Sequence, residues 1–159
     1  MAKMLLLTQS DGRWSLNKIG NTALTLGRWG CTITCLSMFS SFYGCYKSPA
    51  EIAKMPGLFD AQGRIYWGAI EKAFGGKIKF VYRYGGQGKA VFNRKAILAS
   101  LENSPNTTVM LEVRNFSHWV AVVGVYGDDF YVIDPIDGKK KLAIKSFGNI
   151  TGSAHLIKA

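Results

Sequence analysis

Apolar residues in the first two thirds of the chain recur at the three- and four-residue spacing that gives a helix one apolar face. The clearest case is residues 31–43, in which an apolar stripe begins at Cys35 and continues through Phe39. Gly44 follows at the position where helices commonly end in a left-handed residue. The pattern therefore predicts a helix whose first turn contains Cys31.

Three further helices are predicted at 48–55, 64–76 and 92–103. The first begins at Ser48 and has Glu51 three residues later, the spacing of a capping box in which each residue bonds to the backbone of the other. The second ends at a pair of glycines, and the third begins after an asparagine that can cap it. This part of the chain is therefore expected to be mainly helical.

Short apolar and β-branched runs of strand type replace the helical pattern in the last third of the chain. They cover 107–113, 118–125, 130–134, 140–144 and 153–159, with turn-forming residues between the middle three. Consecutive antiparallel hairpins are expected there. Helices followed by an antiparallel sheet indicate an α+β fold in which the N-terminal helices pack on one face of a C-terminal sheet.

Length and composition are those of a single domain, 1–159, with 48% hydrophobic residues to form its core. No apolar run approaches the roughly 18 residues that span a bilayer. The run Met4–Leu7 near the start is also too short for a secretory signal. We therefore expect no transmembrane segment and no signal peptide, and a cytoplasmic or phage-associated protein.

The chain is strongly basic, with 20 Lys and Arg against 10 Asp and Glu and a net charge of +10. Such a charge favours anionic partners, among them nucleic acid and cell-wall polymers. The basic residues are scattered, however, and form one cluster at Lys139–Lys141. No zinc-finger spacing or RNA-recognition signature accompanies them. Both a solvated basic surface and an anionic partner are compatible with this pattern.

Three cysteines stand close together in the sequence, and their surroundings differ. Cys31 is expected in the first turn of a helix, where unpaired amide groups and the helix dipole favour a reactive thiolate. Cys35 belongs to the apolar stripe and is expected in the core, and Cys45 is interpreted as structural. Their spacing, with no histidine nearby, does not fit a zinc site, and no metal or cofactor is expected.

A thiolate nucleophile needs an imidazole base and a third group that orients the imidazole. His118 stands at the entry of one predicted strand, and Asp134 stands at the exit of the next. If 118–125 and 130–134 form a hairpin, the two side chains become cross-strand neighbours within hydrogen-bonding reach. The other histidine, His155, has no acidic residue near it in the sequence. The sequence thus predicts a Cys31–His118–Asp134 triad.

Four segments carry a resemblance to papain-fold cysteine peptidases of the bacteriocin-processing type, which include the leader-cleaving domains of peptide exporters. Residues 30–38 resemble the nucleophile helix of that family, and 118–124 with 131–138 resemble its histidine strand and Asp-Pro…Gly segment. Residues 8–14 are similar to its N-terminal stretch, in which a glutamine supplies an oxyanion-hole donor. The resemblance implies a papain-like fold, a peptide or protein substrate, and Gln9 as that donor.

The expected function is that of a papain-like cysteine hydrolase, with a peptidase as the first interpretation. A cell-wall amidase or endopeptidase is an alternative, because it shares the Cys–His chemistry and the positive charge would favour anionic wall polymers. A catalytically inactive papain-fold protein that binds nucleic acid or an acidic partner is the alternative from a different class. Steep salt dependence of binding without thiol reactivity would distinguish that class.

Overall fold

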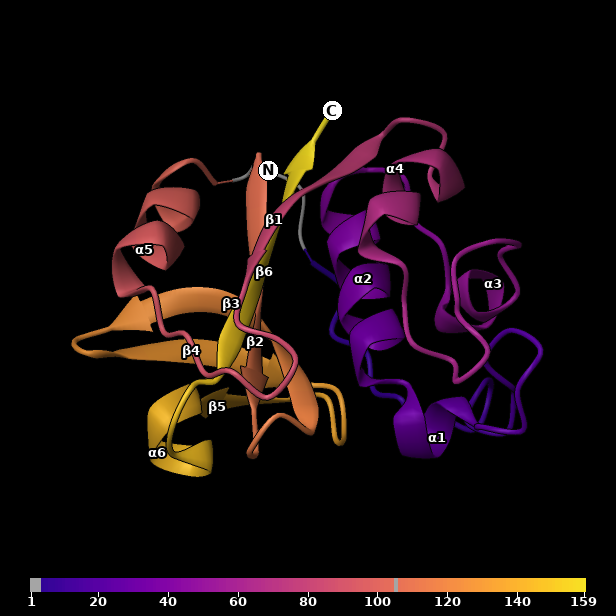
Figure 1. Ribbon diagram of the computed structural model, residues 1–159, viewed down its shortest axis with the longest axis horizontal. Coiled ribbons are helices and arrows are strands. Elements are labelled where there is room, and N and C mark those ends of the chain that lie inside the picture. Colours follow the sequence, from indigo (N-terminus) through magenta and orange to yellow (C-terminus); the bar gives the residue numbers. More distant parts are fainter. Residues whose placement is uncertain (1–3, 105) are drawn as a thin grey trace.

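The computed structural model describes residues 4–104 and 106–159 and combines one six-stranded antiparallel sheet with short helices (Figure 1). The fold class is α+β, as the sequence pattern predicts. The strands are β1 (Ile78–Tyr84), β2 (Thr107–Val113), β3 (His118–Tyr126), β4 (Asp129–Asp134), β5 (Lys139–Leu142) and β6 (Gly152–Lys158). The helices are α1 (Leu26–Trp29), α2 (Cys31–Phe42), α3 (Pro49–Ala53), α4 (Ile70–Ala73), preceded by the 3₁₀ turn η1 (Trp67–Ala69), α5 (Arg94–Glu102) and α6 (Ala143–Phe147).

The strand order in the sheet is β1-β6-β2-β3-β4-β5. Tight turns join β3 to β4 and β4 to β5, so the predicted consecutive hairpins are confirmed. The last strand, β6, lies between β1 and β2. In this register Ala121 faces Ile133, and Asp134 faces Lys139. The start of β3 and the end of β4 therefore lie at the same end of the sheet.

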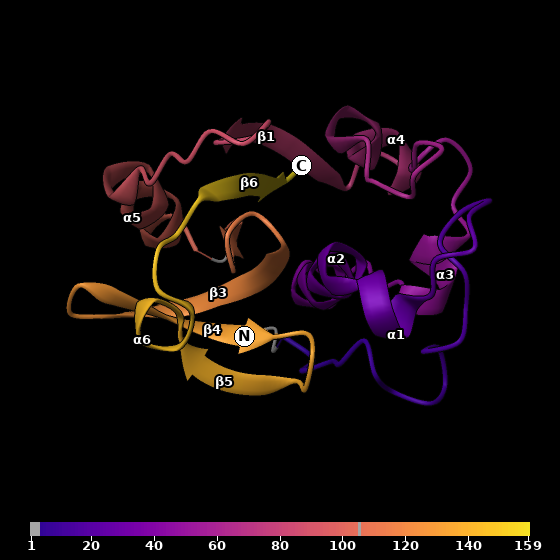
Figure 2. The same cartoon turned by 60° about the horizontal axis from the view of Figure 1, so that its bottom comes forward.

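Helices α2, α3 and α4 cover one face of the sheet, and α2 packs directly against β3. Cys35 and Phe39 of α2 are fully buried in this layer, as is Ala121 of β3, and Trp119 of β3 is largely buried beside them. Figure 2 shows α1 to α4 gathered on this side of the sheet. The packing places the N-terminal end of α2 beside the start of β3.

The other face of the sheet is covered by α5 and α6 (Figure 2), so the prediction of helices on one face is wrong. Val120, Val122 and Val132 point to this second layer and pack with Ile97 of α5 and Ala143 of α6. The physical reason lies in β3, whose first residues are a continuous apolar run. A strand of that kind is apolar on both faces, and each face must be shielded from water.

Two predicted elements differ from their expected bounds in ways that change the fold locally. The helix expected at 64–76 begins only at η1, because Ile65 forms a β-bridge with Phe59 instead. The strand expected at 140–144 ends at Leu142, and the chain then turns into α6. Both elements are shorter than predicted. At these points the backbone conformation is set by tertiary contacts rather than by the local spacing of apolar residues.

Other local predictions are confirmed. Ser48 and Glu51 form both hydrogen bonds of a capping box at α3, each 3.1 Å long. Gly44, with φ of +79°, ends α2 in the left-handed region. Residues 4–7 have no regular secondary structure, and Leu7 is buried. Within residues 4–104 and 106–159, no helix has the length and apolar character needed to cross a membrane.

Candidate active site

Cys31 is the first residue of α2 and is half-buried. Gly30 lies between α1 and α2 so close to the preceding helix that a Cβ atom there would lie 2.5 Å from the carbonyl oxygen of Leu26. A glycine is therefore required at this position, and its tight packing fixes the direction in which α2 begins. The thiol consequently stands at the N-terminal end of a helix of 12 residues, as predicted.

His118 and Asp134 form a buried hydrogen bond in which Nε2 of the imidazole lies 2.7 Å from Oδ1 of the carboxylate. Only 4% of His118 and 1% of Asp134 is exposed. The predicted pair is thus present, although the two residues are not directly opposite each other. Continuing the register of β3 and β4 by one residue from Ala121 and Ile133 sets Val120 opposite Asp134. His118 reaches the carboxylate diagonally.

The thiol of Cys31 and the imidazole of His118 influence one another's protonation. Burial by itself raises the pKa of Cys31, but hydrogen bonding to His118 and its charge outweigh burial, and the pKa lies below its ordinary value. Burial lowers the pKa of His118, whereas Asp134 and Cys31 raise it more, to about 9. A lowered thiol pKa beside a raised imidazole pKa favours the thiolate–imidazolium pair near neutral pH.

Asp134 is held by groups on both of its oxygens. Oδ1 also accepts a hydrogen bond from the backbone of Ile136 at 3.0 Å. Oδ2 accepts one from Nζ of Lys141 at 2.7 Å, and the same ammonium pairs with Asp137 at 2.9 Å. Burial raises the pKa of Asp134, but hydrogen bonds from His118, Lys141 and Ile136 lower it by more. The pKa therefore lies below its ordinary value, and the carboxylate stays ionised.

The contact of Lys141 with Asp134 was not predicted from the sequence, in which Lys141 is one member of the basic cluster Lys139–Lys141. The register of β4 and β5 explains its position, because Val132 faces Lys141 and Asp134 faces Lys139. Side chains two residues apart on a strand share a face, so Lys141 lies diagonally across from Asp134. A hairpin register worked out from the turn could have indicated this contact.

Phe147 of α6 covers the buried pair. Its ring centroid lies 5.9 Å from that of His118 in an edge-on arrangement, and its ring also lies 5.9 Å from Nζ of Lys141. Helix α6 is held in place by Asp129, whose carboxylate accepts backbone hydrogen bonds from Ile144 and Lys145. An aromatic ring in this position limits the access of water to the His118–Asp134 bond, which strengthens it.

Gln9 is buried between the Asp134 turn and α1. Its backbone nitrogen donates to the carbonyl of Pro135 at 2.8 Å, and its Nε2 donates to the carbonyl of Gly27 at 3.2 Å. Oε1 of Gln9 is buried without a hydrogen-bond partner among the described residues. The segment around Gln9 thus connects the turn after Asp134 with the short helix that precedes Cys31. One of the two Nε2 hydrogens is left for another acceptor.

The other cysteines and the second histidine are not part of the candidate triad. Cys35 is fully buried in the core, and burial raises its pKa well above the ordinary value. Cys45 is half-buried, and burial raises its pKa as well. His155 is fully buried on β6 and bonds to Ser100 and Ser153. The expected place of Cys35 in the core is confirmed.

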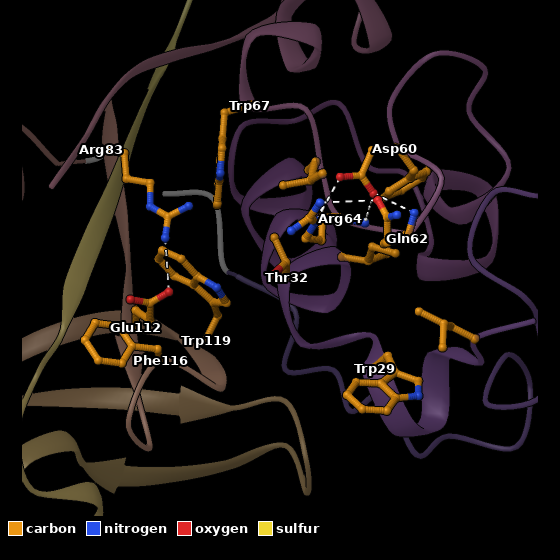
Figure 3. Close-up of a pocket in the computed structure, with 15 residues that line it drawn as sticks. Trp29, Thr32, Asp60, Gln62, Arg64, Trp67, Arg83, Glu112, Phe116 and Trp119 are labelled. Atoms are coloured by element: carbon orange, nitrogen blue, oxygen red, sulfur yellow. Dashed lines mark hydrogen bonds and ion pairs between the residues drawn. The ribbon is translucent and has the colours of Figure 1, made fainter. Parts of the chain in front are cut away.

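A cleft of about 430 Å³ lies between the sheet and the helical layer, beside the candidate triad. Thr32 and Trp119, the residues that follow Cys31 and His118, both line it. Figure 3 shows Asp60 and Arg64 on the helical side of the cleft and Arg83 on the sheet side. The wall is rich in aromatic rings, contributed by Trp29, Phe59, Trp67, Phe116 and Trp119.

The described part of the chain contains no group of three or more His, Cys, Asp and Glu side chains placed to hold a metal ion. The arrangement of Cys31, His118 and Asp134 suits nucleophilic attack by sulfur, with proton transfer through the imidazole. Comparison of the chain with protein-family models and with curated proteins finds no match. Function is therefore inferred from the side chains of the site.

Proposed function

We propose that this protein is a papain-like cysteine hydrolase that cleaves peptide bonds, with Cys31 as nucleophile, His118 as base and acid, and Asp134 as the group that orients His118. One observation carries the proposal: the buried 2.7 Å bond from His118 Nε2 to Asp134 leaves the other ring nitrogen for the thiol at the start of α2. The order of helix and antiparallel sheet supports a papain-like fold of the bacteriocin-processing type.

The proposed reaction has two steps. The thiolate of Cys31 attacks the carbonyl carbon of the substrate, an S–C bond forms, and the C–N bond breaks as the imidazolium of His118 gives its proton to the leaving amine. Water then attacks the resulting thioester, His118 accepts a proton from the water, and the carboxylic acid leaves as the thiol is regenerated. Asp134 holds one imidazole tautomer and stabilises the imidazolium in both steps.

Gln9 is assigned the role of an oxyanion donor together with the backbone N–H of Cys31. Its Nε2 carries a second hydrogen beyond the one given to Gly27. The buried side-chain amide is fixed by its bond to Gly27, and the backbone of Gln9 is fixed by its bond to Pro135. Both bonds support a preorganised donor, which is the form in which such groups act most strongly.

The direct test is incubation of the purified protein, and of a Cys31→Ser variant, with a mixed peptide library and with purified peptidoglycan. We expect new peptide N-termini, detected by mass spectrometry, with the wild type only. If amines are released from peptidoglycan and no peptide is cleaved, the activity is that of a cell-wall amidase rather than a peptidase. Absence of any product, with an unreactive Cys31, would contradict the hydrolase and favour a binding protein.

A further inference from the structure

The cleft beside the candidate triad is lined by an arginine that has no role in the proposed steps of hydrolysis. Arg83 of β1 donates from Nη2 to Oε2 of Glu112 at 3.1 Å. Glu112 is 4% exposed, and its other oxygen accepts a hydrogen bond from Oγ1 of Thr151 at 3.0 Å. Arg83 is therefore held by an acidic group that is itself fixed on both oxygens.

Two tryptophan rings further restrict the guanidinium. Its central carbon lies 5.0 Å from the ring centroid of Trp119 and 5.7 Å from that of Trp67. Those two rings lie 5.3 Å apart and contact each other. Figure 3 shows the guanidinium group beside Trp67 and above Trp119, with Glu112 below. A guanidinium that is stacked and anchored in this way loses little further freedom when it binds a ligand.

Arg83 keeps unused hydrogen-bond donors, and its side chain lines the cleft and is 28% exposed. Its Nε is buried, and within residues 4–104 and 106–159 no acceptor bonds to it. The Glu112 bond uses one of the five N–H groups that an arginine carries. A planar fork with free N–H groups matches a carboxylate, which it can bind through two parallel hydrogen bonds.

The position of Arg83 ties it to the proposed reaction centre. Glu112 pairs with Trp119 across β2 and β3, and the next pair along is Val113 with His118. Trp119 and Arg83 both line the cleft that Thr32 also lines. A ligand bound at Arg83 would therefore lie in the cleft that is lined by the residues following Cys31 and His118 in the chain. The net charge of +10 also favours an anionic ligand.

We propose that Arg83 binds a carboxylate of the substrate, so that the cleft selects peptides with an acidic residue, or a free C-terminal carboxylate, close to the bond that is cleaved. This inference rests on the proposed hydrolase function. Charge-assisted hydrogen bonds contribute about 1.5–3 kcal/mol, which corresponds to a preference of about 10- to 100-fold in kcat/KM.

Matched peptides test the proposal. Peptides that the wild type cleaves are prepared with Glu or Gln at each position, and with a free or amidated C-terminus, so that the two sources of carboxylate are separated. We expect the wild type to prefer one carboxylate series, and Arg83→Gln to lose the preference while it retains alkylation of Cys31. Lys79→Gln, on an exposed position of the same strand, controls for the change in net charge.

A second readout does not depend on turnover. Binding of three peptides to Cys31→Ala protein is measured by the change in intrinsic tryptophan fluorescence, to which Trp67 and Trp119 contribute. The peptides are N-acetyl-Ala-Glu-Ala-amide, its Gln counterpart, and N-acetyl-Ala-Gln-Ala with a free C-terminus. One outcome is that the protein prefers a carboxylate peptide, that Arg83→Gln abolishes this preference, and that the wild type cleaves no peptide. That outcome would contradict the hydrolase function and still support the carboxylate site. The inference about Arg83 would be overturned if cleavage and binding showed no preference for a carboxylate, or if folded Arg83→Gln kept the preference. The proposed hydrolase function would be unaffected by either result.

Discussion

The Nζ atom of Lys141 lies 2.7 Å from Oδ2 of Asp134, the oxygen that does not face His118. The carboxylate is thus shared between an imidazole that must gain and lose a proton and an ammonium that stays charged. Sharing weakens the effect of Asp134 on His118 and at the same time fixes the orientation of the carboxylate. Lys141 is therefore a positioning residue for the triad.

Lys141→Met should move the alkaline limb of the pH–activity profile to higher pH. The whole charge of Asp134 would then act on His118, whose pKa is already raised to about 9. Lys140→Met is the matched control, because the Lys140 ammonium lies over the Tyr131 ring at 4.3 Å and has no contact with Asp134 in the structure. If the alkaline limb is identical in the wild type and in Lys141→Met, Lys141 does not affect the protonation of His118 and its role is purely structural.

Asp134→Asn should retain the fold and lower turnover by about 10²–10⁴-fold, because the amide no longer fixes the tautomer of His118 or stabilises its protonated form. Asp137→Asn should change turnover little. Asp137 contacts Lys141 but not His118, and its side chain is partly exposed. Circular dichroism and turnover of both variants provide the check, and equal losses in the two would contradict the assignment of Asp134.

Gln9→Ala should lower turnover by about 10²-fold or more, the usual effect of losing one oxyanion donor, with the alkylation rate of Cys31 unchanged. The reason is that an oxyanion exists only during reaction with a carbonyl substrate and not during alkylation. Gln9→Glu is a useful companion, since it keeps the volume and replaces the donor by an acceptor. Unchanged turnover in both variants would leave Gln9 as a packing residue that joins the Asp134 turn to α1.

His155 should give the protein a second, unrelated dependence on pH. Burial lowers the pKa of His155 to about 4, below the value near 6.5 of an unfolded chain. Between these values the unfolded state binds the extra proton, so the stability due to neutral His155 is present above pH 6.5 and is lost as the pH falls toward 4. His118, with a raised pKa, contributes with the opposite sign and loses its contribution as the pH rises through about 9.

The comparison of wild type with His155→Asn isolates the first effect. The variant should be less stable than the wild type at pH 8, and the difference in free energy of unfolding should shrink by about 2 kcal/mol at pH 5. Urea unfolding at the two pH values measures it. A difference that does not change with pH would mean that the pKa of His155 is the same in the folded and the unfolded state, which would contradict the lowering by burial.

Local signals in the sequence predict much of the α2 region and of the hairpins. The capping box of Ser48 and Glu51 acts within one helical turn, and the His118–Asp134 contact follows from a short hairpin. Such features need only neighbouring residues, so spacing alone indicates them. The diagonal rather than direct pairing of His118 with Asp134 depends on register, which spacing leaves open.

Contacts between distant segments are not visible in the sequence pattern. Strand β1 was not predicted, because an edge strand with exposed residues such as Val81 lacks a clean alternation. The Arg83–Glu112 ion pair joins β1 to β2, although β6, from the last part of the sequence, lies between these two strands in the sheet. The second helical layer on the sheet was likewise set by tertiary packing rather than by local spacing.

The most direct measurement is the rate of alkylation of Cys31 by iodoacetamide against pH, with Cys35 and Cys45 followed in the same sample by peptide mass spectrometry. We expect Cys31 to react fastest and with an apparent pKa below that of an ordinary thiol, because His118 outweighs the effect of burial. In His118→Ala burial is opposed only by the weaker hydrogen bonds from Trp119 and Thr32, so the apparent pKa of Cys31 should rise. An ordinary apparent pKa for Cys31 in the wild type, unchanged in His118→Ala, would contradict the proposed nucleophile and its base.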